Sequence, residues 1–169
     1  IYNVEKEIER CLASILNQDY MDLELILVND CSPDRSFEVA QSFIKTHAFE
    51  AQTKYVNHSV NRGLSTARNS GIEIADGDYL FFLDSDDALA EKNAITSMIE
   101  GAIQIDKNLP QIIVGNRWVE GDSKPRAMPE ALYVNNDEIY NAYLQSDFSI
   151  IACGKLIQKQ FLIDHNLYF

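Results

Sequence analysis

The stretch DYLFFLDSDDALAEKN, residues 78–93, joins a run of large apolar residues to three closely spaced carboxylates. Residues 79–83 form a short and almost wholly apolar run, which is typical of a strand covered on both faces of a sheet. Asp84, Asp86 and Asp87 follow directly, and like charges this close repel one another unless a cation lies among them. The stretch therefore predicts a buried strand that ends in an acidic, cation-binding turn.

The rest of the chain alternates between apolar residues at helical spacing and short apolar runs. The helical spacing predicts helices over residues 5–17, 32–46, 64–75, 94–105, 137–145 and 158–166. The apolar runs predict strands over residues 23–28, 53–58, 79–83 and 111–116. Helices that alternate with buried strands indicate an α/β fold with a mainly parallel sheet. No period is readable from 119 to 136, where we expect a long connection.

Length, charge and cysteine content narrow the class of protein. The 169 residues fit one compact domain, and a net charge of −12 argues against a nucleic-acid partner, because phosphate binding needs a basic surface. Cys11, Cys31 and Cys153 have no C-x-x-C spacing, so we expect a reducing, cytoplasmic setting and neither a disulfide framework nor a zinc site. No apolar run reaches the length of about 20 residues that a membrane-spanning helix needs.

Acidic residues follow two of the predicted strands. In open α/β sheets ligands bind outside the carboxyl ends of the strands, where Asp30 and the pair Asp84 and Asp86 stand. In extended backbone Asp84 and Asp86 point to the same side. Mg²⁺ and Mn²⁺ prefer oxygen ligands and usually take one or two carboxylates, with phosphate oxygens and water completing the shell. We therefore expect a Mn²⁺ or Mg²⁺ cofactor that binds together with a diphosphate.

Each of these short motifs also has a purely structural alternative. The acidic turn could cap the helix that follows, and Asp30 could cap backbone amides in a strand-to-helix turn. Residues 61–63 could form a left-handed turn, and Arg68 could be a solvated helix residue. The three histidines, His58 among them, lack metal-ligand spacing and are expected to be structural or exposed.

Three segments decide between these alternatives by their order and spacing: IYNVEKEIERCLASILNQ (1–18), LILVNDCSPDRS (25–36) and NRGLSTARNSGIEIADGDYLFFLDSDD (61–87). Together they resemble the inverting, nucleotide-sugar-dependent glycosyltransferases of family 2, which have the GT-A fold. The resemblance is strong over residues 1–107 and looser through IIACGKLIQKQFLIDHNLYF (150–169). Asn29 departs from the family pattern, since many members have an Asp there.

The resemblance implies a role for individual residues. Asp30 matches the residue that contacts the uracil ring, Asp84 the one near the ribose and metal, and Asp86 the metal ligand, while Arg68 and Asn69 match the diphosphate side. The full implied nucleotide-sugar-binding set is Tyr2, Asn3, Asp30, Arg62, Gly63, Arg68, Asn69, Asp84 and Ser85, and the implied metal ligands are Asp86 and Asp84.

The two ends of the chain depart from the family pattern. Members begin with a strand of the type VSIIIPVYN, in the middle of the sheet, whereas residues 1–3 match only its end. We therefore expect a single GT-A domain over residues 1–169 that is incomplete at both ends. Residues 1–118 would form the nucleotide-sugar-binding half and 119–169 the start of the acceptor-side half. The catalytic base is expected beyond Phe169, with Asp137, Glu138 or Asp147 as alternatives within the chain.

By this resemblance the protein is expected to transfer a hexosyl or N-acetylhexosaminyl group from a UDP-sugar, with inversion, to a polysaccharide or a lipid-linked glycan. Any contact with the inner face of a membrane would involve parts outside this chain, and the oligomeric state is left open. Two alternatives remain at this point: a nucleotidyltransferase, and a catalytically silent nucleotide-binding module.

Overall fold

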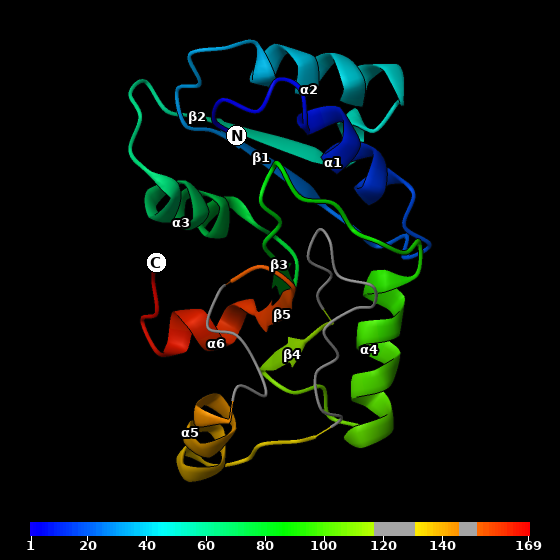
Figure 1. The fold of residues 1–169 in the computed structure, drawn as a ribbon, viewed down its shortest axis with the longest axis vertical. Coiled ribbons are helices and arrows are strands. Elements are labelled where there is room, and N and C mark those ends of the chain that lie inside the picture. Colours follow the sequence, from blue (N-terminus) through cyan, green and yellow to red (C-terminus); the bar gives the residue numbers. More distant parts are fainter. Residues whose placement is uncertain (117–130, 146–151) are drawn as a thin grey trace.

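The computed structural model describes residues 1–116, 131–145 and 152–169 (Figure 1). The elements follow one another as α1 (Ile8–Leu16), β1 (Leu25–Asn29), α2 (Ser36–Thr46), η1 (Glu50–Gln52), β2 (Thr53–Asn57), α3 (Leu64–Ile74), β3 (Tyr79–Phe81), α4 (Ala94–Ile105), β4 (Ile112–Val114), α5 (Asn136–Leu144), β5 (Lys155–Gln158) and α6 (Lys159–Asp164). The predicted boundary between residues 118 and 119 lies outside the described residues, as does most of the predicted connection 119–136.

β1 is covered by helices on both faces, as its apolar sequence predicts. It pairs in parallel with β2, from Leu25 opposite Thr53 to Asn29 opposite Asn57. Leu25 and Leu27 pack with residues of α1 and α2 in one core cluster. Ile26 and Val28 point to the other face, where Gly71 of α3 approaches them closely. A Cβ at Gly71 would meet Val28 Cγ2 at 3.7 Å and Ile26 Cγ2 at 3.9 Å, which is ordinary van der Waals contact, so α3 lies directly on this face.

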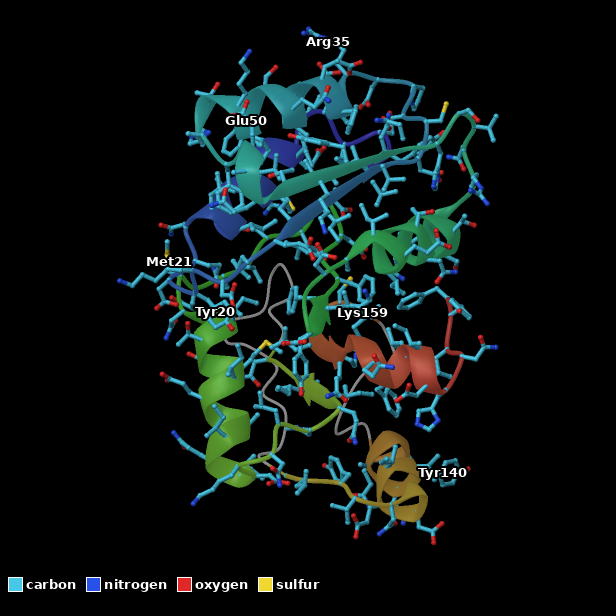
Figure 2. All side chains as sticks on the ribbon, turned by 180° about the vertical axis from the view of Figure 1, so that it is seen from behind. Tyr20, Met21, Arg35, Glu50, Tyr140 and Lys159 are labelled. Carbon is cyan, nitrogen blue, oxygen red and sulfur yellow. The ribbon has the colours of Figure 1, made fainter. Side chains whose placement is uncertain are left out.

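The second sheet has the order β3-β5-β4 (Figure 1). β5 pairs antiparallel with both neighbours, so β3 and β4 run parallel to each other. The sequence did not predict β5, because its four residues directly precede α6 and carry too little periodicity to separate them from that helix. Lys159, labelled in Figure 2, stands at the start of α6. Its Nζ donates to the carbonyl oxygen of Ala75, the residue directly after α3. This contact connects α6, which directly follows β5 of the second sheet, to the end of α3, which covers the first sheet.

Several boundaries differ from those predicted. β3 ends at Phe81, and Phe82 forms only a single parallel bridge with Cys153. α1 begins at Ile8 instead of residue 5, and α2 begins at Ser36 instead of residue 32. The start of α2 is shifted because Asp34 Oδ1 accepts from the Ser36 backbone nitrogen at 3.0 Å, so the predicted capping residues form a turn before the helix.

A groove of about 1200 Å³ separates β1 from β3. Apolar side chains of both strands line it, and among the described residues the two strands belong to different sheets. Ile1 lies along the end of β1: its nitrogen donates to the Val28 carbonyl at 2.5 Å, and its carbonyl accepts from the Asp30 nitrogen at 3.1 Å.

The described helices do not include one with both the length and the apolar character needed to cross a bilayer.

Candidate functional site

The groove between β1 and β3 brings together most of the residues that the sequence predicts for the site. It is lined at the carboxyl ends of the two strands by Tyr2, Asp30, Gly63, Arg68, Asp84, Ser85 and Asp86. A smaller hollow of about 650 Å³, lined by residues that include Asp78 and Tyr79, lies at the amino end of β3 and contains none of the predicted site residues. The polar and charged residues predicted for the site therefore lie at the carboxyl ends of the strands, where α/β sheets bind their ligands.

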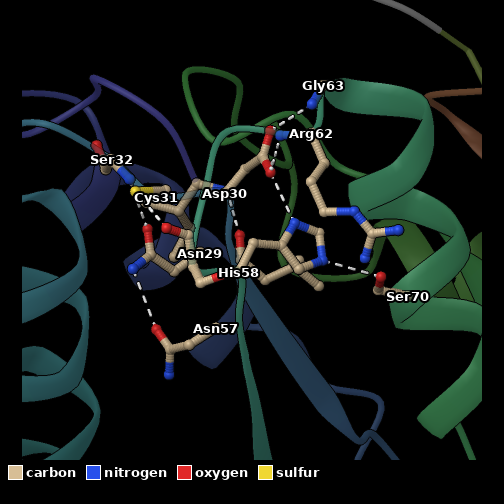
Figure 3. A network of polar contacts seen from close by, with 12 residues as sticks. Asn29, Asp30, Cys31, Ser32, Asn57, His58, Arg62, Gly63 and Ser70 are labelled. Atoms are coloured by element: carbon tan, nitrogen blue, oxygen red, sulfur yellow. Dashed lines mark hydrogen bonds and ion pairs between the residues drawn. The ribbon is translucent and has the colours of Figure 1, made fainter.

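Asp30 connects three segments through its carboxylate (Figure 3). Its Oδ1 accepts from His58 Nδ1 at 2.6 Å and from the backbone nitrogen of Arg62 at 2.8 Å. Its Oδ2 accepts from the backbone nitrogen of Gly63 at 2.7 Å. Burial opposes ionisation of Asp30, but these three hydrogen bonds outweigh it and hold the pKa of Asp30 below its ordinary value. The carboxylate is ionised at neutral pH, and since it can accept about four hydrogen bonds, one acceptor position is left for a ligand.

His58 belongs to this site, although the sequence indicated only a structural or exposed histidine. Its side chain is 5% exposed, and its Nε2 lies 2.9 Å from Ser70 Oγ on α3. One sequence signal could have identified it: His58 directly follows the strand that pairs with β1, so it stands at the carboxyl end of β2 as Asp30 does at the end of β1.

Arg68 and Asp84 form the second charged centre of the groove. Arg68 donates from a terminal guanidinium nitrogen to Asp84 Oδ1 at 2.9 Å, and only 17% of the Arg68 side chain is exposed. The guanidinium carbon also lies 5.2 Å from the ring centre of Phe169. The alternative that Arg68 is a solvated helix residue is therefore wrong.

The acidic turn faces the groove and does not cap a helix. Asp87 donates its backbone N–H to the Asp84 carbonyl at 2.9 Å to close the turn, and α4 begins only at Ala94, with Asn93 before it. Arg10, on α1, donates to the carbonyl oxygen of Asp86 and was not predicted as a neighbour of this turn. The alternative that this motif caps the next helix is thus not supported.

Three predicted residues lie outside the lining of the groove. Both polar ends of the Asn69 side chain bind the backbone of Phe169, with Nδ2 donating to its carbonyl at 3.1 Å and Oδ1 accepting from its nitrogen at 3.0 Å. Arg62 contributes its backbone nitrogen to Asp30. Asn3 has a positive φ of 54° and donates its backbone N–H to Ser32 Oγ. Their roles at the ligand stay predictions.

The carboxylates fit a metal that completes its shell with ligand oxygens. Among the described residues no group of three or more His, Cys, Asp or Glu side chains is arranged to hold a metal ion unaided. Asp84 and Asp86 both line the groove, and one or two carboxylates are what Mg²⁺ usually takes from a protein when phosphate supplies further ligands.

The two thiols beside this centre are not reactive nucleophiles. Burial, together with the charge of Asp87, raises the pKa of Cys11 to about 11. Burial and the neighbouring Asp84 raise the pKa of Cys153 to about 11. Both thiols are protonated at neutral pH, so neither provides the thiolate that nucleophilic chemistry requires.

The chain is similar to known proteins in both sequence and fold. The sequence model of glycosyl transferase family 2 matches residues 1–165. Glycosyltransferase GlyA of Streptococcus pneumoniae is 33% identical over 172 residues, covering 95% of this chain and 24% of GlyA. The crystal structure of S. aureus TarS 1-349 superposes on all of this chain with a TM-score of 0.73 and 26% identity, covering 48% of that chain.

The mannosyltransferase PcManGT from Pyrobaculum calidifontis, solved in complex with GDP-Man and Mn²⁺, superposes with a TM-score of 0.68 and 20% identity, which shows the fold alone. This chain therefore spans about a quarter of GlyA and about half of each solved chain. The predicted α/β GT-A architecture and the predicted family are both confirmed: the chain belongs to glycosyl transferase family 2.

Proposed function

We propose that the groove binds a nucleotide-sugar, with a UDP-sugar preferred over a GDP-sugar. This nucleotide-sugar would be the donor substrate of an inverting glycosyl transfer. The observation that carries the proposal is the placement of two different polar centres in one groove. Asp30 offers a hydrogen-bond acceptor at the end of β1, and Arg68 with the acidic turn offers charge at the end of β3. A nucleoside diphosphate needs these two chemistries side by side.

The Asp30 end suits the base of the nucleotide. An ionised carboxylate with one acceptor position left can accept an N–H from the uracil ring. Guanine also presents N–H donors, and the fold neighbour from P. calidifontis was solved with GDP-Man, so GDP is the nucleotide against which UDP has to be compared.

The Arg68 end suits the diphosphate. A guanidinium forms strong, charge-assisted hydrogen bonds to phosphate oxygens. Asp84 and Asp86 are the residues that would hold Mn²⁺ or Mg²⁺, and the ion, when bound, would offset the charge of the departing diphosphate. Asp84 keeps Arg68 turned toward this place through their ion pair.

Transfer requires a carboxylate that deprotonates the acceptor, which we propose to be a glycan or a lipid-linked glycan. Asp137 and Glu138 lie on α5, which Figure 1 places at the end of the molecule away from β1, and neither lines the groove. Asp147 lies outside the described residues. Phe169, in contrast, packs beside Arg68, which supports a base in the segment that follows it. The reducing cytoplasm is the proposed location, with which the three free thiols agree.

The test is calorimetry and turnover with the full-length protein that contains these residues. We expect UDP to bind more tightly than GDP, with higher affinity in the presence of Mn²⁺, and sugar to move from a UDP-sugar to a glycan acceptor. Nucleotide binding without any transfer or UDP-sugar hydrolysis would favour a silent binding module. Transfer of the nucleotidyl group instead of the sugar would favour a nucleotidyltransferase.

A further inference from the structure

We propose that His58 and Ser70 are positioning residues that link the nucleoside end of the groove to its diphosphate end. They form a hydrogen-bonded series with Asp30, which we call the Ser70–His58–Asp30 chain. The inference rests on the proposed function, because it assigns Asp30 to the base and Arg68 to the diphosphate.

The Ser70–His58–Asp30 chain joins three separate elements (Figure 3). Asp30 follows β1, His58 follows β2, and Ser70 lies on α3. His58 Nδ1 lies 2.6 Å from Asp30 Oδ1, and His58 Nε2 lies 2.9 Å from Ser70 Oγ. The Asp30 and His58 side chains are only 6% and 5% exposed, so water competes little for either contact.

The direction of these hydrogen bonds follows from the carboxylate. An ionised carboxylate only accepts, so His58 Nδ1 carries a proton and donates it. Both ring nitrogens are thereby engaged, which fixes the orientation of the imidazole. The order of groups is that of a serine hydrolase triad, but Ser70 does not line the groove, so a ligand in the groove does not meet its hydroxyl.

The chain attaches α3 to Asp30 at a second point. The first attachment is at the start of the helix, where the backbone nitrogens of Arg62 and Gly63 donate to Asp30. Ser70 comes seven residues after Gly63, about two helical turns, and so lies on the same side of α3. Together with the packing of Gly71 against Ile26 and Val28, these two attachments on one side set the rotation of the helix about its axis.

The rotation of α3 determines where Arg68 points. Arg68 lies on α3 between the two attachments and reaches Asp84 across the groove at 2.9 Å. Release of the second attachment would leave α3 held to Asp30 only at its start. Arg68 would then be less well directed, even though neither His58 nor Ser70 touches it. The inference therefore predicts an effect on diphosphate affinity from a change on the nucleoside side.

The experiment measures UDP, UMP and pyrophosphate affinities by calorimetry, with Mn²⁺, on the full-length protein. Ser70→Ala, which removes one oxygen, should weaken both UMP and pyrophosphate by about fivefold, the usual effect of one lost hydrogen bond. Ser70→Thr keeps the hydroxyl and should restore both. Asp30→Ala removes the acceptor of both attachments as well as the contact to the base, so it should weaken pyrophosphate at least as much as Ser70→Ala does, and UMP further still.

Two variants of His58 separate its two contacts. His58→Asn retains an N–H near the position of Nδ1, so it keeps the contact to Asp30 and should behave like Ser70→Ala. His58→Gln retains a polar group near the position of Nε2 but no longer donates to Asp30, so it should lose UMP affinity further. The matched controls are His47→Asn, at the exposed C-cap of α2, and Ser97→Ala, at an exposed position of α4. Both lie outside the groove and should bind as the wild type does. Should a His58 variant fail to fold, Ser70→Ala and Ser70→Thr carry the test.

Wild-type affinities in Ser70→Ala, or equal weakening in Ser70→Ala and Ser70→Thr, would overturn the inference while leaving the proposed function in place. Failure of the wild-type protein to bind UDP would overturn both.

Discussion

Replacement of Asp30 by Asn should destabilise the fold by an amount that the hydrogen bonds of Asp30 determine. Three N–H groups donate to this carboxylate, from His58, Arg62 and Gly63. An Asn side chain has one oxygen and one NH₂ group, so in either orientation its NH₂ meets at least one N–H that has lost its acceptor. The less costly orientation keeps the contacts of Oδ1 and leaves the Gly63 nitrogen without an acceptor.

The loss of unfolding free energy in Asp30→Asn has two parts. A donor left unsatisfied in a buried place costs about 1–3 kcal/mol, and the two hydrogen bonds that remain change from charge-assisted to neutral, with a loss of about 0.5–1 kcal/mol each. The free energy of unfolding should fall by about 2–5 kcal/mol, a large part of the 5–15 kcal/mol typical of a domain. Urea unfolding followed by circular dichroism at neutral pH measures it, with the exposed acid Asp164→Asn as the control.

The same pair of proteins gives a pH test. The pKa of Asp30 is lower in the folded than in the unfolded protein, so its contribution is present above the unfolded value of about 3.9 and is lost as pH falls through the folded value. The stability difference between wild type and Asp30→Asn should therefore be constant from neutral pH to about pH 4 and shrink below it. A difference no larger than that of Asp164→Asn, or one that grows in acid, would refute the account of Asp30.

Further predictions concern other parts of the site and fold. Asp86→Ala should abolish most of the gain in UDP affinity that Mn²⁺ gives, as measured by calorimetry; an unchanged gain would remove Asp86 from the metal assignment. Arg68→Lys should weaken UDP and pyrophosphate alike by about tenfold, because the bidentate donor is lost, and a selective loss of UDP would contradict its place at the diphosphate. Gly71→Ala should raise the free energy of unfolding by about 0.5–1 kcal/mol, since a Cβ there would meet Val28 Cγ2 only at 3.7 Å; a loss of stability would show that α3 lies closer to β1. Iodoacetamide at neutral pH should label exposed Cys31 well before Cys11 and Cys153, because a raised pKa keeps these two thiols protonated; equal labelling on peptide mass analysis would contradict the raised pKa of both.

The sequence predicted the order of helices and strands well where periodicity was strong. Apolar residues at helical spacing predict α1 and α4, and a short apolar run predicts the strand β1. All three elements were found. β5 was missed because a four-residue strand depends on pairing with β3 and β4, which are distant in sequence. The start of α2 was misplaced because Asp34 accepts from Ser36 in a turn, and composition alone does not separate a turn from a helix cap.

For the site, the sequence predicted the residues that come directly after strands, and the groove contains most of them. It did not predict the contacts between side chains. His58 became part of the site only when β2 was placed beside β1, and Asn69 proved to bind the backbone of a residue 100 positions away. Such pairs follow from tertiary packing, which a single sequence does not specify.

The most direct test of the central claim is a structure of the full-length protein with UDP and Mn²⁺ bound. The account predicts the uracil ring beside Asp30, the diphosphate near Arg68, and the metal between the diphosphate and the carboxylates of Asp84 and Asp86. A nucleotide bound in the hollow at the amino end of β3, or one in the groove with its base at Asp86 and its phosphates at Asp30, would contradict it.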